Sequence, residues 1–185
     1  MGFDPNAVRQ QFPALQREVN GRPAIYADGP SGTQVPQRVI DAMAGYLTNG
    51  SSNQGGAYIT GRENNAMAHA AHEALADLLN ARQPAEIVVG QNMTSLTYAM
   101  SRSISREWKP GDEIIVTRLD HEGNISPWLQ AAADRDVTVR WLDVDTSDCT
   151  LKLEDLAGLL NKRTRLLAIT YASNAVGSIT DMAEV

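Results

Sequence analysis

The chain has 185 residues, a formal net charge of -6 at pH 7 and a sequence pI near 5.0. Its arginines are scattered, which argues against nucleic-acid binding, because that function needs lysine and arginine clustered on one face. The sequence has no apolar run near the ~18 residues of a membrane span, and its one cysteine, Cys149, excludes an internal disulfide framework, so we expect a cytoplasmic protein.

The first half of the sequence predicts two helices and a short strand. Apolar residues at helical spacing predict a helix over 35–46, with Pro36 near its start, where a missing N–H carries no penalty. A second helix is expected over 64–79, with Asn65 as its cap and small apolar residues along one side. The apolar run over 86–89 predicts a strand.

The second half of the sequence alternates between helices and strands. The expected elements, in chain order, are a helix over 94–106, a strand over 113–117, a helix over 125–133, a strand over 137–142, a helix over 153–160 and a strand over 165–170. Apolar strands separated by helices are typical of a mostly parallel sheet that is covered on both faces. The sequence therefore predicts an α/β fold with three layers, in which helices enclose the sheet.

Polar residues follow three of the predicted strands. Thr94 comes after the strand over 86–89, His121 after the strand over 113–117, and Asn174 after the last strand. Ligands bind at βα junctions in α/β sheets, at the edge where the carboxyl ends of parallel strands meet. We therefore expect these polar groups to face one crevice.

The turn that contains Asn92, Met93 and Thr94 precedes a predicted helix and is a candidate phosphate site. Helix N-termini expose unpaired N–H groups and carry a partial positive charge, so a phosphate dianion is favoured there, and a threonine hydroxyl adds one donor. The alternative is that Asn92 or Thr94 only caps the helix, which is worth about 1 kcal/mol.

The sequence has three histidines, and His121 is the one at a predicted strand end. For His121 alone, a helix-capping or buried hydrogen-bonded ring is the alternative to a functional role. His69 and His72 lie on one side of the helix over 64–79, but the sequence offers no third ligand in a suitable place. We therefore expect no metal site.

The three segments that contain Thr94, His121 and Asn174 together resemble the pyridoxal-phosphate enzymes of the class V aminotransferase and cysteine desulfurase family, which have fold type I. The resemblance implies that Asn92, Met93 and Thr94 hold the cofactor phosphate. It also implies that His121 stacks on the pyridine ring, with proton relay as an additional role, and that Asn174 lies beside the ring. The turn departs from the family's usual Gly-Thr-Thr form, because Asn92 and Met93 leave only the second threonine.

Residues 25–43 add a fourth similar segment, which looks like the family's opening strand, its turn and its first helix. Enzymes of this family are considerably longer than the present chain, and a later segment brings the lysine that binds the cofactor covalently. Lys109, Lys152 and Lys162 do not follow a strand in that context. We therefore expect residues 1–20 to be an N-terminal segment and 21–185 to be an incomplete PLP-binding large domain, without the small C-terminal domain.

The resemblance implies a homodimeric enzyme that acts on an amino-acid substrate with pyridoxal 5'-phosphate. Desulfuration, β-elimination, transamination and epimerisation remain open, and the 185-residue chain alone is expected to be inactive without its lysine. The alternative is a catalytically inactive PLP- or phosphate-binding regulatory domain. A nucleotide-binding module is disfavoured, since the sequence has neither G-x-G-x-x-G nor G-x-x-x-x-G-K-[ST].

Overall fold

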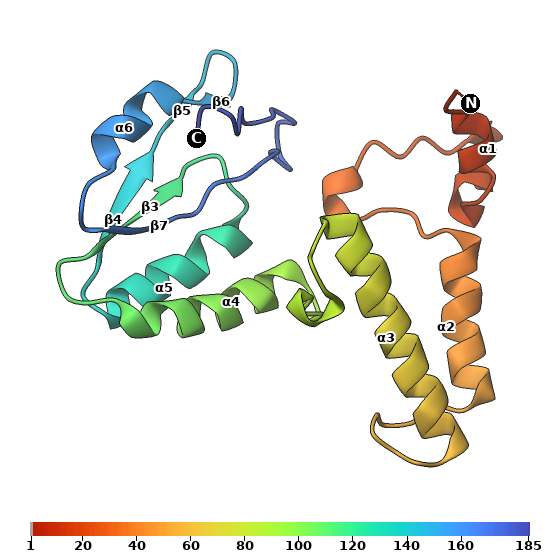
Figure 1. Ribbon diagram of the computed structural model, residues 1–185. Helices are drawn as coiled ribbons and strands as arrows, with labels where there is room; N and C mark the ends of the chain where they lie inside the picture. The colour runs from red at the N-terminus through yellow and green to blue at the C-terminus, as the bar shows by residue number, and fades with distance from the viewer. Residues whose placement is uncertain (1) are drawn as a thin grey trace. The chain divides into compact units, whose positions relative to one another are not determined.

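The computed structural model describes residues 2–185 (Figure 1). Contacts between residues divide the chain into two units, one up to Val88 and the other Val89–Val185. No helix in the described residues has the length and apolar character that crossing a bilayer requires.

The first unit is mainly helical. Its elements are the helices α1 (Pro5–Arg9), α2 (Gln37–Asn49) and α3 (Ile59–Leu79), the strands β1 (Glu18–Val19) and β2 (Arg22–Pro23), and the 3-10 turns η1 (Pro13–Gln16), η2 (Gly29–Ser31) and η3 (Pro84–Glu86). The strands β1 and β2 form an antiparallel hairpin, and Asn20 (φ 54) and Gly21 (φ 72) make its turn. An Asn-Gly pair with two positive φ angles is typical of the tightest hairpin turns.

The two long helices of this unit were predicted, but with different starts. Helix α2 begins at Gln37, and Pro36 is its N-cap. Helix α3 begins at Ile59, so the prediction that Asn65 caps it was wrong. Asn65 lies inside the helix, and its Oδ1 accepts a hydrogen bond from the Gly55 N–H at 2.9 Å. Tertiary bonds of this kind allow a polar segment to join the helix despite its weak propensity.

Two segments expected as strands are not strands. Residues 25–28 are irregular, and Ile25 is 92% exposed. In the 86–89 segment, Glu86 ends η3 and the following residues have no strand structure. A strand is defined by its hydrogen-bonded neighbour, and among the described residues no strand pairs with either segment.

The second unit contains the sheet. Its helices are α4 (Met93–Ile104), α5 (Ser126–Asp134) and α6 (Leu156–Leu159), its strands are β3 (Glu113–Thr117), β4 (Thr138–Leu142), β5 (Val144–Asp145), β6 (Thr150–Leu151) and β7 (Thr164–Leu167), and its 3-10 turns are η4 (Ser105–Glu107), η5 (Glu122–Asn124) and η6 (Leu153–Asp155). The strand order is β4-β3-β7, and both pairings are parallel. The predicted parallel sheet is confirmed, whereas the antiparallel pair β5-β6 was not predicted.

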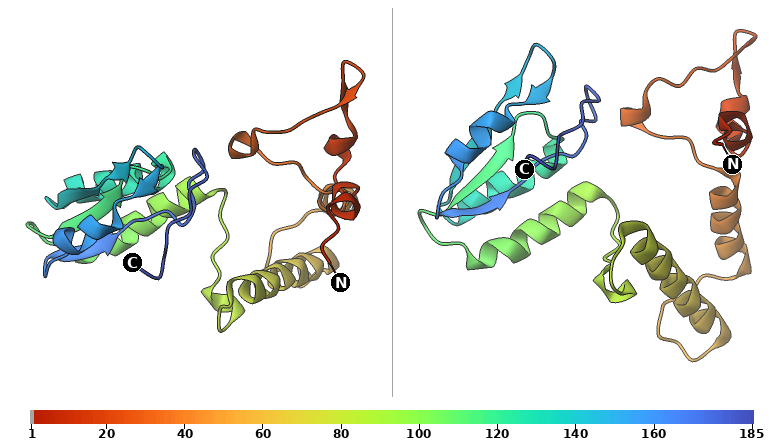
Figure 2. Two further views of the ribbon diagram at one scale, coloured as in Figure 1. Left: turned by 90° about the horizontal axis from the view of Figure 1, so that it is seen from above. Right: turned by 45° about the horizontal axis from the view of Figure 1, so that its top comes forward.

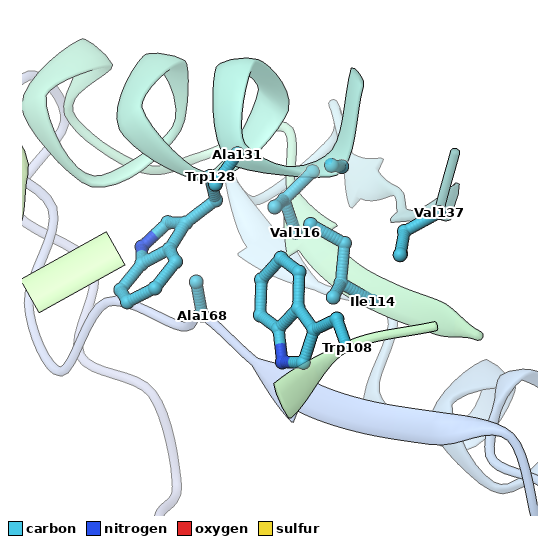
Figure 3. Close-up of a cluster of buried hydrophobic side chains, with 8 residues drawn as sticks. Trp108, Ile114, Val116, Trp128, Ala131, Val137 and Ala168 are labelled. Atoms are coloured by element: carbon cyan, nitrogen blue, oxygen red, sulfur yellow. The ribbon is translucent and has the colours of Figure 1, made fainter. Parts of the chain in front are cut away.

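Each face of this sheet packs against its own apolar cluster. Figure 3 shows the first cluster, in which Ile114 and Val116 of β3 meet α5 and the tilted indole rings of Trp108 and Trp128, whose centroids lie 6.5 Å apart. Ile115 belongs to the second cluster, with Leu142, Leu151 and Leu156. Successive residues of a strand point to opposite faces, so both faces are covered and the three-layer prediction is confirmed (Figure 2).

Candidate functional site

The candidate site lies at the carboxyl edge of the sheet. Strands β3 and β7 are parallel neighbours, so the segments after Thr117 and after Leu167 start from the same edge. His121 belongs to the first of these segments and Asn174 to the second. The turn η5, which follows His121, contacts α4. His121 and Asn174 therefore lie on segments that leave the edge at which ligands bind in α/β sheets.

The first turn of α4 combines a side-chain cap with free donors. Asn92 is the N-cap, and its Oδ1 accepts a hydrogen bond from the Ser95 N–H at 2.9 Å. No hydrogen bond among the described residues uses the N–H groups of Met93 and Thr94 or the Thr94 hydroxyl. The capping alternative thus holds for Asn92, while the next two residues present unpaired donors at the positive end of the helix dipole.

Gly123 brings three of the predicted residues together. A Cβ atom at this buried position would lie 2.6 Å from Thr94 Oγ1, 3.0 Å from His121 Nδ1 and 3.2 Å from Met93 Cε. The close approach of the η5 backbone to α4 therefore depends on a residue without a side chain. Nothing in the local sequence marks Gly123, because two of these neighbours, Met93 and Thr94, come from a distant segment of the chain.

The ring of His121 is held by its own loop. The Gly123 N–H donates a hydrogen bond to His121 Nδ1 at 2.9 Å, so the ring also caps η5. Because Nδ1 accepts, the hydrogen of the neutral ring resides on Nε2. The residue is exposed, which leaves Nε2–H accessible as a donor at the edge of the sheet.

Asp120 orients this loop through the backbone and not through the imidazole. Its Oδ1 accepts a hydrogen bond from the His121 N–H at 2.8 Å, and its Oδ2 accepts one from Asn124 Nδ2 at 2.7 Å. Burial raises the pKa of the Asp120 carboxyl above its usual value, against the lowering effect of these bonds. The carboxylate thus ties two residues of the loop together.

Asn174 sits in a well-defined turn. The Oγ of the preceding residue, Ser173, accepts hydrogen bonds from the N–H groups of Ala175 and Val176, both at 3.3 Å. Gly177 closes the turn with a φ of +76°. The Asn174 side chain is exposed, and no hydrogen bond among the described residues links it to His121 or to α4.

The other histidines have structural partners. His69 Nε2 lies 3.2 Å from Glu73 Oε1, and His72 Nδ1 lies 3.3 Å from the Pro84 carbonyl oxygen. In the part of the chain that the structure describes, no group of three or more His, Cys, Asp or Glu side chains is placed to hold a metal ion.

Two of the three lysines lie away from the site. Lys109 precedes β3 and Lys162 precedes β7, so both are at the amino edge of the sheet, opposite to His121. Lys152 follows the short strand β6. None of the three therefore follows a strand of the β4-β3-β7 sheet.

Comparisons with known proteins agree with this geometry. The family model described as aminotransferase class-V matches residues 25–185. A cysteine desulfurase of Synechococcus elongatus is 36% identical over 188 residues, which cover 100% of this chain and 30% of that protein. The crystal structure of the Escherichia coli cysteine desulfurase CsdA, in its S-sulfonic acid form, superposes on this chain with a TM-score of 0.84 and 28% sequence identity. The superposed region covers 100% of this chain and 45% of the CsdA chain.

A third relative is a variant of C-DES with glycine covalently linked to its PLP cofactor, at a TM-score of 0.72 and 26% identity over 95% of this chain and 44% of that protein. The chain spans less than half the length of each of these relatives. The family model nevertheless covers most of the sequence, and the chain belongs to the class-V aminotransferase family.

Proposed function

We propose that the protein containing this chain is a PLP-dependent enzyme of the cysteine desulfurase type that acts on an amino-acid substrate. The names of the curated relatives support this reaction class, and the cofactor in the C-DES structure supports PLP. Residues 21–185 would form part of the PLP-binding large domain. The proposals of a cytoplasmic location and a homodimer stay predictions from the sequence.

The observation that carries the proposal is the meeting of α4 with the His121 loop. At the N-terminus of α4, the free N–H groups of Met93 and Thr94 and the Thr94 hydroxyl are suited to a phosphate dianion. A Cβ atom at Gly123 would collide with both Thr94 and His121, so these two side chains lie close to the same backbone position. A cofactor that carries both a phosphate and an aromatic ring fits this pairing.

In the proposed enzyme, PLP supplies an electrophilic aldehyde carbon for the substrate amine and an electron-accepting ring. The protein binds the cofactor and orients it. Met93 and Thr94 would fix the phosphate, His121 would lie against the ring with Nε2–H available for proton transfer, and Asn174 would contact the ring from the turn after β7.

The test is activity of the full-length protein with cysteine. With PLP and a thiol present, breaking the C–S bond of cysteine and transferring its sulfur to the thiol as a persulfide should yield alanine, which is quantified by chromatography. Absence of a bound-cofactor absorbance band would contradict the proposal and favour an unrelated or regulatory role. Cofactor binding without turnover of any amino acid would identify the inactive PLP-binding alternative.

Replacement of Thr94 by valine should weaken PLP binding. The substitution keeps the shape of the side chain and removes one donor to a charged phosphate, which is worth about 1.5–3 kcal/mol. That loss corresponds to an increase in Kd of about ten- to a hundredfold, measured by cofactor titration of the apoprotein. Thr97→Val is the matched control, because the Thr97 hydroxyl already donates to the Met93 carbonyl oxygen at 2.9 Å. An unchanged Kd in Thr94→Val would exclude a phosphate contact.

Reduction with borohydride should fix the cofactor outside residues 1–185. The placement of Lys109, Lys152 and Lys162 leads us to expect that peptide mapping by mass spectrometry finds none of them stoichiometrically modified. A variant with all three replaced by arginine should retain its reducible cofactor. Stoichiometric modification of any of the three would show that the chain carries its own attachment site.

A further inference from the structure

Asn124 occupies a bridging position next to the candidate site. Its Nδ2 donates to Asp120 Oδ2 at 2.7 Å, and its Oδ1 accepts from the Trp128 Nε1–H at 3.1 Å. Its own N–H donates to the His121 carbonyl oxygen at 2.8 Å. A carboxylate only accepts and an indole N–H only donates, so this pair of partners fixes which end of the amide faces which group.

One end of this bridge is anchored in the core. Trp128 is 6% exposed and packs with Trp108, Ile114 and Val116 between α5 and the sheet (Figure 3). A buried indole in a close-packed cluster has little freedom to move. The oxygen of Asn124 is therefore held by a rigid part of the fold.

The other end reaches the histidine. Asp120 accepts the Asn124 side chain on one oxygen and the His121 N–H on the other. The resulting series of hydrogen bonds runs from Trp128 through Asn124 and Asp120 to the backbone of His121. Without the amide, Asp120 loses its side-chain donor and the loop loses this hydrogen-bonded link to Trp128.

We propose that Asn124 is a positioning residue, which fixes the loop so that His121 keeps Nδ1 on the Gly123 N–H and presents Nε2–H at the edge of the sheet. The effect of Asn124 on catalysis rests on the proposed function. Its effect on the ring of His121 is a property of this chain alone and is measurable without a cofactor.

The experiment compares Asn124→Ala and Asn124→Asp with the unaltered full-length apoprotein. Nitrogen NMR of ¹⁵N-labelled histidine reports which ring nitrogen of His121 carries the hydrogen. We expect Nε2–H alone in the unaltered protein and a mixture of both tautomers in each variant. Ser126→Ala is the control, because it removes a hydrogen bond to Glu122 in the same turn and leaves the bridge intact.

The aspartate variant covers the case in which Asn124→Ala does not fold. Its side chain keeps an oxygen that accepts from the Trp128 N–H, so the hydrogen bond to the core is retained. It also places a second carboxylate next to Asp120, so the hydrogen bond that Asn124 donates to Asp120 is lost. The proposal is overturned if the His121 tautomer in Asn124→Asp, and in Asn124→Ala where folded, equals that of the unaltered protein.

The second readout is turnover of the PLP-loaded enzyme. Small displacements of a catalytic group are costly, so we expect kcat to fall by about tenfold or more in the Asn124 variants, with PLP affinity less affected than in Thr94→Val because Met93 and Thr94 are untouched. An unchanged kcat would contradict the positioning role. If the unaltered protein binds no PLP, the proposed function fails, while the tautomer measurement still decides on Asn124.

Discussion

Replacement of His121 by alanine in the full-length enzyme should lower kcat by about a hundred- to ten-thousandfold, the range that a positioned acid–base group contributes. The structural cost is small by comparison. The exposed ring caps only η5, through the Gly123 N–H, and loss of such a cap costs about 1 kcal/mol. Steady-state kinetics and the unfolding midpoint, measured on the same preparation, separate the two effects.

Two further substitutions divide the roles of the His121 ring. Phenylalanine keeps an aromatic face for stacking and removes both nitrogens, whereas asparagine supplies an oxygen for the Gly123 N–H and removes the ring. We expect Phe to preserve the cofactor absorbance better than Asn, and both to turn over slowly. His69→Ala, on an exposed part of α3, is the control. Wild-type kcat and an unchanged cofactor spectrum in His121→Ala would refute the assignment of this histidine.

The sequence predicted β3 and β4 best, and β3 is buried on both faces. β3 has the predicted bounds, and β4 starts only one residue later than expected, at Thr138. All five residues of β3 are buried, so each one contributes to the same apolar run. A strand of this kind is marked by its own residues, and its neighbours only confirm it.

Elements that depend on a distant partner could not be predicted in this way. The segments 25–28 and 86–89 have strand-like composition, yet a strand exists only where another one pairs with it. Asn65 was predicted to cap α3 but lies inside it, where its amide oxygen accepts a hydrogen bond from the Gly55 N–H of the preceding loop. Local propensity is a weak guide wherever such tertiary bonds decide.

The residues of the candidate site also differ in whether the sequence alone could identify them. The roles of Thr94, His121 and Asn174 stay predictions. These residues were proposed from the sequence because polar residues after parallel strands share an edge, although the segment before Thr94 is not a strand. Gly123 and Asn124 were not, because their importance comes from contacts with α4 and with the core. The sequence pattern predicted which edge of the sheet carries the candidate site, whereas Gly123 and Asn124 could be identified only from their packing in the structure.

At the opposite edge of the sheet, Glu113 is expected to control acid stability. This carboxylate is 3% exposed at the start of β3, and it accepts from Arg140 Nε of β4 at 2.6 Å, from Arg163 Nε at 2.9 Å and from Asn161 Nδ2 at 2.8 Å. Hydrogen bonds from Arg140, then from Asn161 and Arg163, lower the pKa of Glu113 to about 2. The network therefore joins β3 and β4 to the segment that precedes β7.

A lowered pKa in the folded state fixes the direction of the pH effect. The stabilisation by ionised Glu113 is fully present above its usual pKa of 4.5 and is lost as the pH falls through about 2, because only the unfolded chain binds the proton readily in that interval. We expect the urea midpoint of unfolding to decrease steadily from pH 4.5 to pH 2.

Glu113→Gln tests whether this carboxylate is the cause. The variant removes the negative charge and one of the two acceptor oxygens that the two guanidinium groups bind, so its urea midpoint at pH 7 should be clearly lower than that of the unaltered protein. Its midpoint should also fall less between pH 4.5 and pH 2, since the titrating group is gone. Asp134→Asn is the control, because Asp134 pairs with Arg102 on the exposed surface, where ion pairs contribute little. If Glu113→Gln and the unaltered protein lost stability in parallel over this range, other carboxylates would have to account for the acid sensitivity.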